Sequence, residues 1–161
     1  LDSRVFEAMQ PFWAQSFGNP ASQIHSKGWE AKSAVEAARE KVARLLRCQP
    51  AEIAFTGGAT ESNNWALKGL IDQLQEENPL EKLHILTSNV EHASVREPLA
   101  YLQKKGVIEV DFVPVDRDGF IALESLEKAR KSTTRIVSLI WVHNEIGTIQ
   151  NMKDIANWAQ K

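Results

Sequence analysis

Cysteine is nearly absent from this chain, which has only Cys48 among its 161 residues. One cysteine excludes an internal disulfide framework and a zinc site built from several cysteines, so we expect no metal and predict a reducing compartment, the cytoplasm. Long apolar runs are also missing, because no stretch approaches the roughly 20 residues that cross a bilayer. With no signal-peptide pattern at the N-terminus, no membrane partner is expected.

The chain also lacks a strong excess of charge of one sign. Nineteen basic and 21 acidic residues are mixed along the sequence and give a formal net charge of −2. No basic stripe is available to bind a phosphate backbone, so nucleic acid is not an expected partner. A hydrophobic content of 43% is ordinary for a globular protein and predicts a domain with a buried core.

Hydrophobic periodicity predicts an alternation of helices and strands. Apolar residues spaced three and four apart indicate helices, and short apolar or alternating runs bounded by turn residues indicate strands. The predicted order is helix 28–46, strand 51–56, helix 61–74, strand 82–87, helix 94–105, strand 107–113, helix 123–130 and strand 135–142. This pattern predicts an α/β fold in which a mostly parallel sheet is flanked by helices.

Residues 1–161 are predicted to form a single, partial domain in which residues 1–27 are a lead-in segment. The first residue is Leu rather than Met, and the last seven residues read as a helix without a stop signal, so we expect a longer parent chain. In open parallel sheets, ligands bind at the carboxyl ends of the strands. This rule places the loops at 57–60, 89–92 and 143–147 on one edge.

The first of these loops lies in the segment Phe-Thr-Gly-Gly-Ala-Thr-Glu-Ser-Asn-Asn at 55–64. Glycines before a helix let the backbone approach a ligand, and the helix start offers unpaired N–H groups and a positive dipole end. Ala59 and Thr60 are therefore candidate donors to a phosphate. Taken alone, this segment fits an ordinary capped turn better than a phosphate site, because it is neither a Walker pattern nor a dinucleotide fingerprint.

Polar side chains follow two further predicted strands. His92, in Glu-His-Ala-Ser, is placed to lie over a planar cofactor or to act as an acid or base, and the alternative is a histidine that caps the next helix. Asn144 is placed to donate to a phenolate or a carboxylate, and the alternative is plain turn chemistry. His25, His143 and Cys48 are interpreted as structural or surface residues.

Four blocks in this order make the chain resemble the cysteine desulfurases of the NifS and IscS type, in the class V aminotransferase superfamily. The blocks are Gly-Asn-Pro-Ala-Ser at 18–22 with His25, the segment at 55–64, Glu-His-Ala-Ser at 91–94, and Asn-Glu-Ile-Gly-Thr-Ile-Gln at 144–150. The resemblance implies the N-terminal part of the large domain of a pyridoxal 5′-phosphate (PLP) dependent transferase with the aspartate aminotransferase-like fold.

The resemblance also implies roles for individual residues. Ala59 and Thr60 match residues that hold the cofactor phosphate, and His92 matches the catalytic histidine that stacks on the pyridine ring and serves in proton transfers. Asn144 matches the asparagine beside the ring oxygen and the substrate carboxylate. The implied reaction converts L-cysteine to L-alanine and transfers sulfur to an enzyme persulfide, in a homodimer that serves iron–sulfur scaffold or other sulfur-acceptor proteins.

Two family features have no match here. No lysine stands in the family's Ser-x-His-Lys context, which supplies the Schiff-base lysine, and Cys48 precedes the phosphate loop rather than lying at the persulfide position. We therefore expect the 161 residues alone to be inactive. Two alternatives remain: another class V activity, such as a selenocysteine lyase or a kynureninase-like enzyme, and a non-catalytic module that binds phosphate, PLP or a partner protein.

Overall fold

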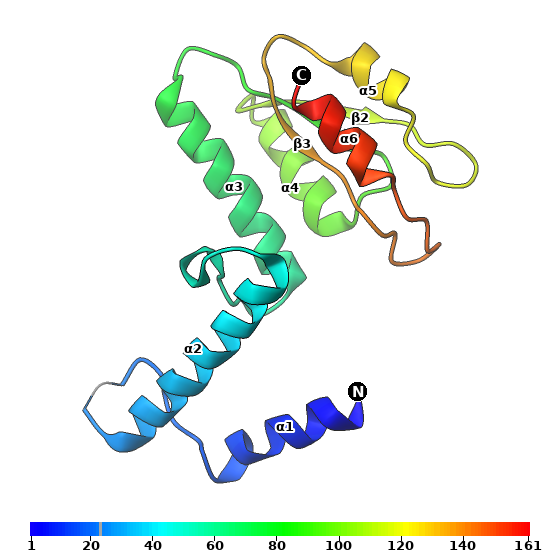
Figure 1. The fold of residues 1–161 in the computed structure, drawn as a ribbon. Coiled ribbons are helices and arrows are strands. Elements are labelled where there is room, and N and C mark those ends of the chain that lie inside the picture. The colour runs from blue at the N-terminus through cyan, green and yellow to red at the C-terminus, as the bar shows by residue number, and fades with distance from the viewer. Residues whose placement is uncertain (23) are drawn as a thin grey trace. The chain divides into compact units, whose positions relative to one another are not determined.

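The computed structural model describes residues 1–22 and 24–161, which form two compact units (Figure 1). The N-terminal unit comprises Leu1–Phe55 and the C-terminal unit comprises Thr56–Lys161. Each unit has its own secondary structure and is described separately. A single domain over residues 1–161 stays a prediction.

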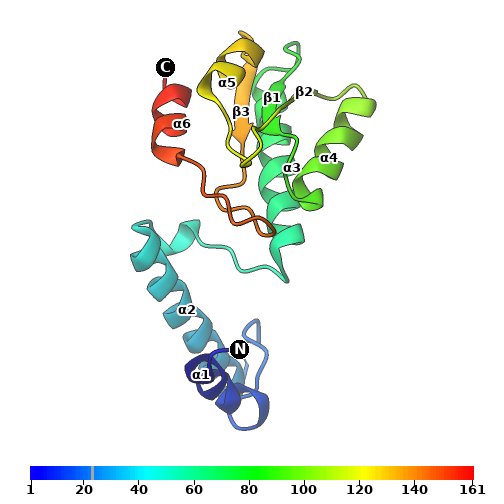
Figure 2. The same cartoon turned by 90° about the vertical axis from the view of Figure 1, so that its right-hand side faces the viewer.

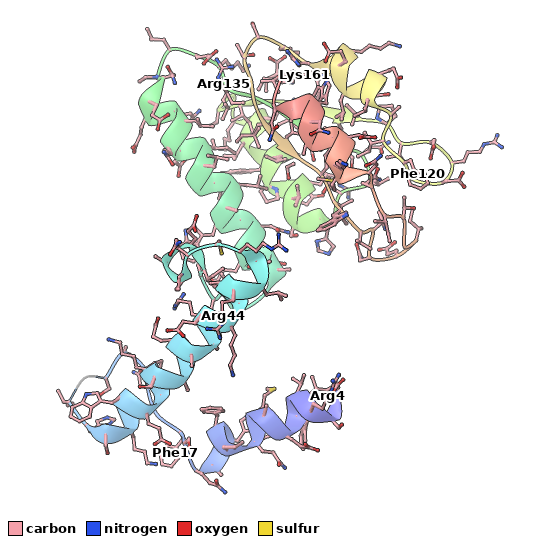
Figure 3. All side chains as sticks on the ribbon, in the orientation of Figure 1. Arg4, Phe17, Arg44, Phe120, Arg135 and Lys161 are labelled. Atoms are coloured by element: carbon pink, nitrogen blue, oxygen red, sulfur yellow. The ribbon has the colours of Figure 1, made fainter. Side chains whose placement is uncertain are left out.

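The N-terminal unit begins with a helix inside the segment that the sequence reading treated only as a lead-in. Helix α1 (Ser3–Ala14) starts where the Asp2 side chain accepts a hydrogen bond from the backbone N–H of Arg4 at 2.9 Å. The rings of Phe6 and Trp13 meet edge to face at 5.4 Å. No residue of α1 is buried, and its side chains project outward along the helix (Figure 3).

Helix α2 (Ser26–Leu46) confirms the helix predicted over 28–46. It begins at His25, whose Nδ1 accepts a hydrogen bond from the backbone N–H of Gly28 at 3.1 Å. Position 28 requires glycine, because a Cβ there would lie 2.1 Å from the backbone oxygen of Ser22. His25 is therefore a capping residue of α2, as the structural interpretation expected.

The strand predicted over 51–56 is wrong. The structure has a short 3₁₀ helix, η1 (Pro50–Glu52), followed by irregular backbone. Pro50 fixes the backbone angle of the first turn, and the Glu52 carboxylate accepts the backbone N–H of Gln49 at 2.6 Å. Residues 53–56 pair with no strand in the described part of the chain, and an apolar run without a partner does not make a strand.

The C-terminal unit confirms the predicted alternation of helices and strands. In chain order it contains α3 (Ala59–Glu77), β1 (His84–Ser88), α4 (Ala93–Lys104), β2 (Glu109–Val113), α5 (Leu123–Ala129), β3 (Thr134–Ser138) and α6 (Met152–Ala159). Strand β3 is shorter than the predicted 135–142, because its partner β1 also ends at this level, where Thr87 pairs with Ser138. The chain then leaves the sheet.

The three strands form a parallel sheet in the order β2-β1-β3 (Figure 2). Both neighbours of β1 start beside His84, which pairs with Glu109 on one side and with Thr134 on the other. Because all three strands point the same way, their carboxyl ends meet at one edge. The predicted mostly parallel sheet is confirmed.

Helices cover both faces of this sheet. Alternate residues of β1 point to opposite faces, so Ile85 packs with α3 and α4 while Leu86 packs with α5 and α6 (Figure 1). The first core contains Leu67, Ile71, Leu83, Ile85, Val95, Leu99, Ile108, Val110 and Ile136, and the second contains Leu86, Val113, Ile121, Leu126 and Ile155. This flanked sheet places the starts of α3 and α4 at the carboxyl edge of the strands.

Candidate functional site

The glycine loop is closed onto the first turn of α3. The Glu61 carboxylate accepts the backbone N–H of Gly57 at 2.6 Å, and the hydroxyl groups of Thr56 and Ser62 lie 2.6 Å apart. These contacts fix residues 56–58 immediately before the helix begins. The loop therefore needs no ligand to hold its shape.

The first turn of α3 keeps donors that the helix itself does not use. The backbone N–H groups of Ala59, Thr60 and Glu61 have no acceptor within the helix, because an α-helix leaves its first N–H groups unpaired. The Thr60 side chain is exposed, and a Cβ added at Gly58 would meet nothing within 4 Å. This helix start therefore offers open space, unpaired donors and a positive dipole end.

His92 is the N-terminal capping residue of α4, which starts at Ala93. Its Nδ1 accepts the backbone N–H of Ser94 at 3.1 Å and lies 2.8 Å from the Ser94 hydroxyl, while the residue as a whole is exposed. The Ser94 hydroxyl in turn accepts a hydrogen bond from the Asn63 amide on α3 at 2.8 Å. The capping role considered for His92 is therefore present, and it leaves the ring accessible.

Glu91, beside His92, is a buried carboxylate that received no individual role in the sequence reading. One of its oxygens accepts hydrogen bonds from the Ser88 hydroxyl at 2.7 Å and from the backbone N–H of Ile140 at 2.8 Å. Burial raises the pKa of Glu91, and these two hydrogen bonds oppose that rise. Glu91 thus joins the end of β1 to the segment that follows β3. The signal for it was an acidic residue four positions after an apolar strand.

Asn144 lies exposed in a tight hairpin after β3. Val142 and Ile149 form an antiparallel bridge, and the backbone N–H of His143 donates to the oxygen of Thr148 at 2.9 Å. The ring Nδ1 of His143 accepts the backbone N–H of Glu145 at 3.2 Å. His143 therefore serves the turn, as the structural interpretation expected, and presents Asn144 to solvent.

A buried amide secures the base of this hairpin. The Gln150 side chain donates to the backbone oxygen of Gly119 at 2.6 Å and accepts the N–H of Ile121 at 3.1 Å. The Thr148 hydroxyl donates to the oxygen of Asp118 at 2.6 Å. The turn at 116–119 therefore supports the hairpin that carries Asn144, although the sequence alone shows no link between two segments about 30 residues apart.

The structure places all four predicted site residues at the carboxyl edge of the sheet (Figure 2). Ala59 and Thr60 start α3, His92 starts α4, and the Asn63 to Ser94 hydrogen bond ties these two helix starts together. Asn144 lies at the same edge but outside that hydrogen-bonded group.

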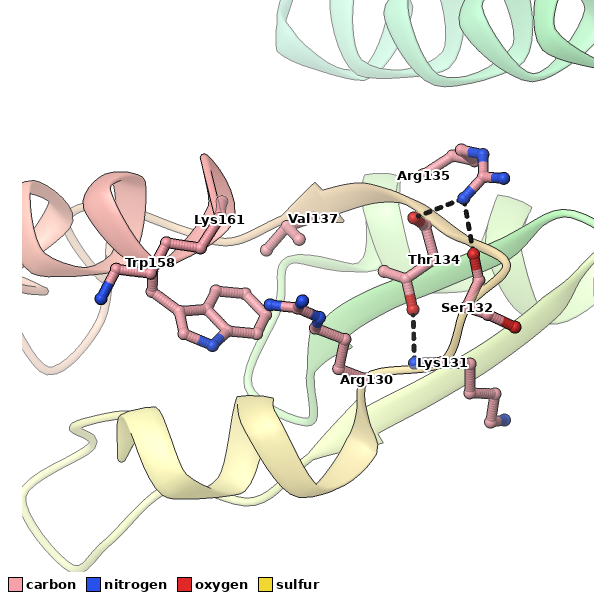
Figure 4. Close-up of a pocket in the computed structure, with 9 residues that line it drawn as sticks. Arg130, Lys131, Ser132, Thr134, Arg135, Val137, Trp158 and Lys161 are labelled. Atoms are coloured by element: carbon pink, nitrogen blue, oxygen red, sulfur yellow. Dashed lines mark hydrogen bonds between the residues drawn. The ribbon is translucent and has the colours of Figure 1, made fainter.

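A cavity lies at the opposite, amino edge of the sheet. This cavity of about 450 Å³ is lined by residues at the end of α5, the start of β3 and the end of α6, among them Arg130, Arg135, Trp158 and Lys161 (Figure 4). The Arg130 guanidinium stands over the Trp158 ring at 5.9 Å. Its lining includes none of Ala59, Thr60, His92 and Asn144, so this cavity is separate from the candidate site.

His84 lies at the same amino edge and is fully buried in the first position of β1. Its ring nitrogens contact the Thr134 hydroxyl at 2.7 Å and the Asp111 carboxylate at 3.2 Å. Burial and the nearby Lys131 ammonium lower the pKa of His84, while Asp111 opposes this change. This histidine is a structural component of the sheet.

Two classes of feature are not found in the described residues. Among residues 1–22 and 24–161, no three potential His, Cys, Asp or Glu ligands gather as a metal site would require. In the same ranges, no helix has both the length and the apolar character needed to cross a bilayer.

Comparison with known proteins gives consistent likenesses. A mitosomal cysteine desulfurase of Trachipleistophora hominis is 44% identical over 156 residues, which cover 96% of this chain and 34% of that protein. The cysteine desulfurase IscS of Dictyoglomus turgidum is 43% identical over 161 residues, which cover 100% of this chain and 39% of that protein. A solved NifS-like protein superposes with a TM-score of 0.88 at 42% identity, covering 99% of this chain and 42% of that one.

The chain thus spans less than two fifths of the length of these two curated relatives. The solved NifS-like protein shares its fold across nearly the whole chain, which confirms the predicted fold class and the likeness to NifS and IscS proteins. The family model described as aminotransferase class-V matches residues 1–161. The chain therefore belongs to the class-V aminotransferase family.

Proposed function

We propose that this chain forms the phosphate- and ring-contacting part of a PLP-dependent cysteine desulfurase. The observation that carries the proposal is the hydrogen-bonded link between the start of α3, which offers unpaired N–H donors, and His92 at the start of α4. An anion site joined to an exposed imidazole suits a phosphorylated, planar cofactor. The names of the relatives supply the reaction class.

The residues present fit the phosphate of that cofactor. Three backbone N–H groups at the start of α3 point away from the helix body, and the open space beside Gly58 leaves room for phosphate oxygens. Ala59 and Thr60 would donate their N–H groups, and the Thr60 hydroxyl would add a third donor. The Glu61 carboxylate is occupied by Gly57, so the ligand need not displace it.

The residues also fit the ring of the cofactor. When bound, PLP supplies the electron sink that labilises bonds of an amino-acid substrate. His92 would lie against the ring and move a proton at its Nε2, because its Nδ1 is engaged by Ser94. Asn144, exposed at the same edge, would donate to the ring oxygen and to the substrate carboxylate.

The substrate would be L-cysteine, which the parent protein would convert to L-alanine while the sulfur passes to a cysteine of the enzyme. The parent is proposed to be a homodimer that supplies iron–sulfur scaffold or other sulfur-acceptor proteins. No lysine here stands in a Ser-x-His-Lys segment, so turnover by these 161 residues alone is not expected. Location in the cytoplasm stays a prediction, since several relatives are named mitosomal or mitochondrial.

The test is absorbance titration of the 161-residue chain with PLP. We expect saturable binding that inorganic phosphate competes away and that Thr60→Ala weakens about tenfold or more, because a hydrogen bond to a charged group contributes about 1.5–3 kcal/mol. Thr133→Ala, which also truncates a threonine but precedes β3 at the opposite edge, should bind like the unmodified chain. Binding that is insensitive to phosphate and to Thr60→Ala would contradict the proposal.

Borohydride treatment of the same samples tests the second expectation. No lysine should gain the mass of reduced PLP, because the anchoring lysine context is missing. An adduct on one specific lysine would show that this chain holds the cofactor covalently and would overturn its expected inactivity.

A further inference from the structure

Three polar groups in a row connect the starts of α3 and α4. The Asn63 Nδ2 lies 2.8 Å from the Ser94 Oγ, and that oxygen lies 2.8 Å from the His92 Nδ1. The backbone N–H of Ser94 also donates to the same Nδ1 at 3.1 Å. Ser94 is only 7% exposed, so solvent competes little for its hydroxyl.

The donor and acceptor properties of these three groups decide which atom donates in each hydrogen bond. An amide NH₂ only donates, so the hydrogen from Asn63 occupies a lone pair of the Ser94 hydroxyl. The single hydroxyl hydrogen is then free to point at the His92 Nδ1, where the backbone N–H of Ser94 already donates. The backbone N–H and the hydroxyl both point at the single lone pair of Nδ1, so the Nδ1 of the neutral ring acts as the acceptor and the ring hydrogen lies on Nε2.

We propose that Asn63 and Ser94 are positioning residues that set the tautomer and orientation of His92. They hold Nδ1 inward as an acceptor and direct the Nε2–H outward at the carboxyl edge of the sheet. The assignment deepens the proposed function and rests on it, because the outward nitrogen matters where His92 faces a bound cofactor and its substrate. Asn63 and Ser94 act through His92 and need touch neither ligand.

Reversing the donor at the start of the row tests this directly. In Asn63→Asp the carboxylate can only accept, so the Ser94 hydroxyl should turn toward it and present a lone pair to His92. We expect the ratio of Nδ1–H to Nε2–H tautomer to rise about fivefold or more, the equivalent of one typical hydrogen bond. The readout is the pair of ring ¹⁵N shifts of His92 in the 161-residue chain without PLP, at alkaline pH where the ring is neutral.

A substitution at the neighbouring residue separates the effect of the hydrogen-bonded row from the effect of an added negative charge. Asn64→Asp introduces the same charge one residue away, but the Asn64 amide contacts the backbone oxygens of Thr60 at 2.9 Å and Ser94 at 3.5 Å rather than the Ser94 hydroxyl. Its tautomer ratio should stay at the level of the unmodified chain. The double variant Asn63→Asp with Ser94→Ala lacks the hydroxyl altogether, so its ratio should lie between those of Asn63→Asp and the unmodified chain.

Folding of the C-terminal unit is monitored through the signals of His84 and His143, which should not move. If Asn63→Asp does not fold, Asn63→Ala removes the fixed donor without adding charge and should raise the Nδ1–H tautomer in the same direction by a smaller factor. An unchanged ratio in every Asn63 variant that folds, or an equal rise in Asn64→Asp, would overturn the assignment. These spectra need no cofactor, so their failure is distinguishable from a failure of PLP binding.

Discussion

Removing the Glu91 side chain should lower the stability of the C-terminal unit more than replacing an exposed residue nearby. Glu91 is 6% exposed, and one carboxylate oxygen accepts both the Ser88 hydroxyl and the Ile140 N–H. In Glu91→Ala both donors lose their acceptor, and each buried unsatisfied group costs about 1–3 kcal/mol. We therefore expect the free energy of unfolding to fall by about 2–6 kcal/mol, a large part of the total for a domain of this size.

Glu91→Gln separates the hydrogen bonds from the charge. The amide oxygen can accept the same two hydrogen bonds, and the neutral side chain avoids the desolvation that raises the pKa of Glu91 above its ordinary value of 4.5. Between 4.5 and the raised pKa, the folded state binds the proton more tightly than the unfolded state, so stability should fall as pH rises through that window and then level off. Glutamine carries no titrating proton and should lack this slope.

Urea unfolding followed by circular dichroism over a pH series measures both effects. Glu97→Ala, an exposed glutamate on α4, is the matched control and should change stability by no more than about 0.5 kcal/mol. The reasoning fails if Glu91→Gln destabilises as much as Glu91→Ala, or if the pH slope persists in the glutamine variant.

The remaining predictions concern the opposite edge of the sheet and the support of the hairpin. Burial lowers the pKa of His84 below its ordinary value of 6.5, so protonation of His84 favours the unfolded state. Stability should therefore fall as pH drops from 6.5 through the lowered pKa. Thermal melts over a pH series should show this loss, and His84→Val should lack it. Gly119→Ala should cost about 2 kcal/mol or more in urea unfolding, because φ is +84° and the new Cβ would lie 2.7 Å from Ile146 Cδ1 and 2.9 Å from Thr148 Oγ1. Gly106→Ala, with φ of +75° and nothing within 4 Å of the new Cβ, should cost only about 1 kcal/mol for backbone strain. Equal losses of stability at both glycines would contradict the expected clash between the new Cβ at position 119 and the hairpin.

The secondary structure of the C-terminal unit was predictable because its signals are local. Apolar spacing marks α3 and α4 to within a few residues, and short apolar runs mark β1 and β2. The same logic failed at residues 51–56, where an apolar run next to Pro50 has no strand beside it. A helix satisfies its own backbone hydrogen bonds, whereas a strand needs a partner that a local pattern cannot reveal.

Helix α1 was missed for a different reason. Its apolar residues recur at helical spacing around Phe6, Met9 and Trp13, but the segment was treated only as a lead-in. Pro11 lies inside the helix, in its last turn. The spacing that predicts this helix was therefore present in the sequence.

For the candidate site too, some features could be predicted from the sequence and others depend on the tertiary structure. The types of residue at 59, 60, 92 and 144, and the likeness to cysteine desulfurases, are properties of the sequence. The contacts that hold these residues join distant segments: Asn63 to Ser94, Glu91 to Ile140, and Gln150 to Gly119.

The sequence by itself therefore determined the helices of the C-terminal unit, its parallel α/β class and the chemical groups at one edge of its sheet. Only the tertiary structure decided that His92 caps α4 while keeping its ring exposed, that Glu91 is buried with a raised pKa, and that residues 51–56 form no strand. Periodicity and capping act within a few residues, whereas burial, hydrogen-bond direction and strand pairing depend on groups that only folding brings together.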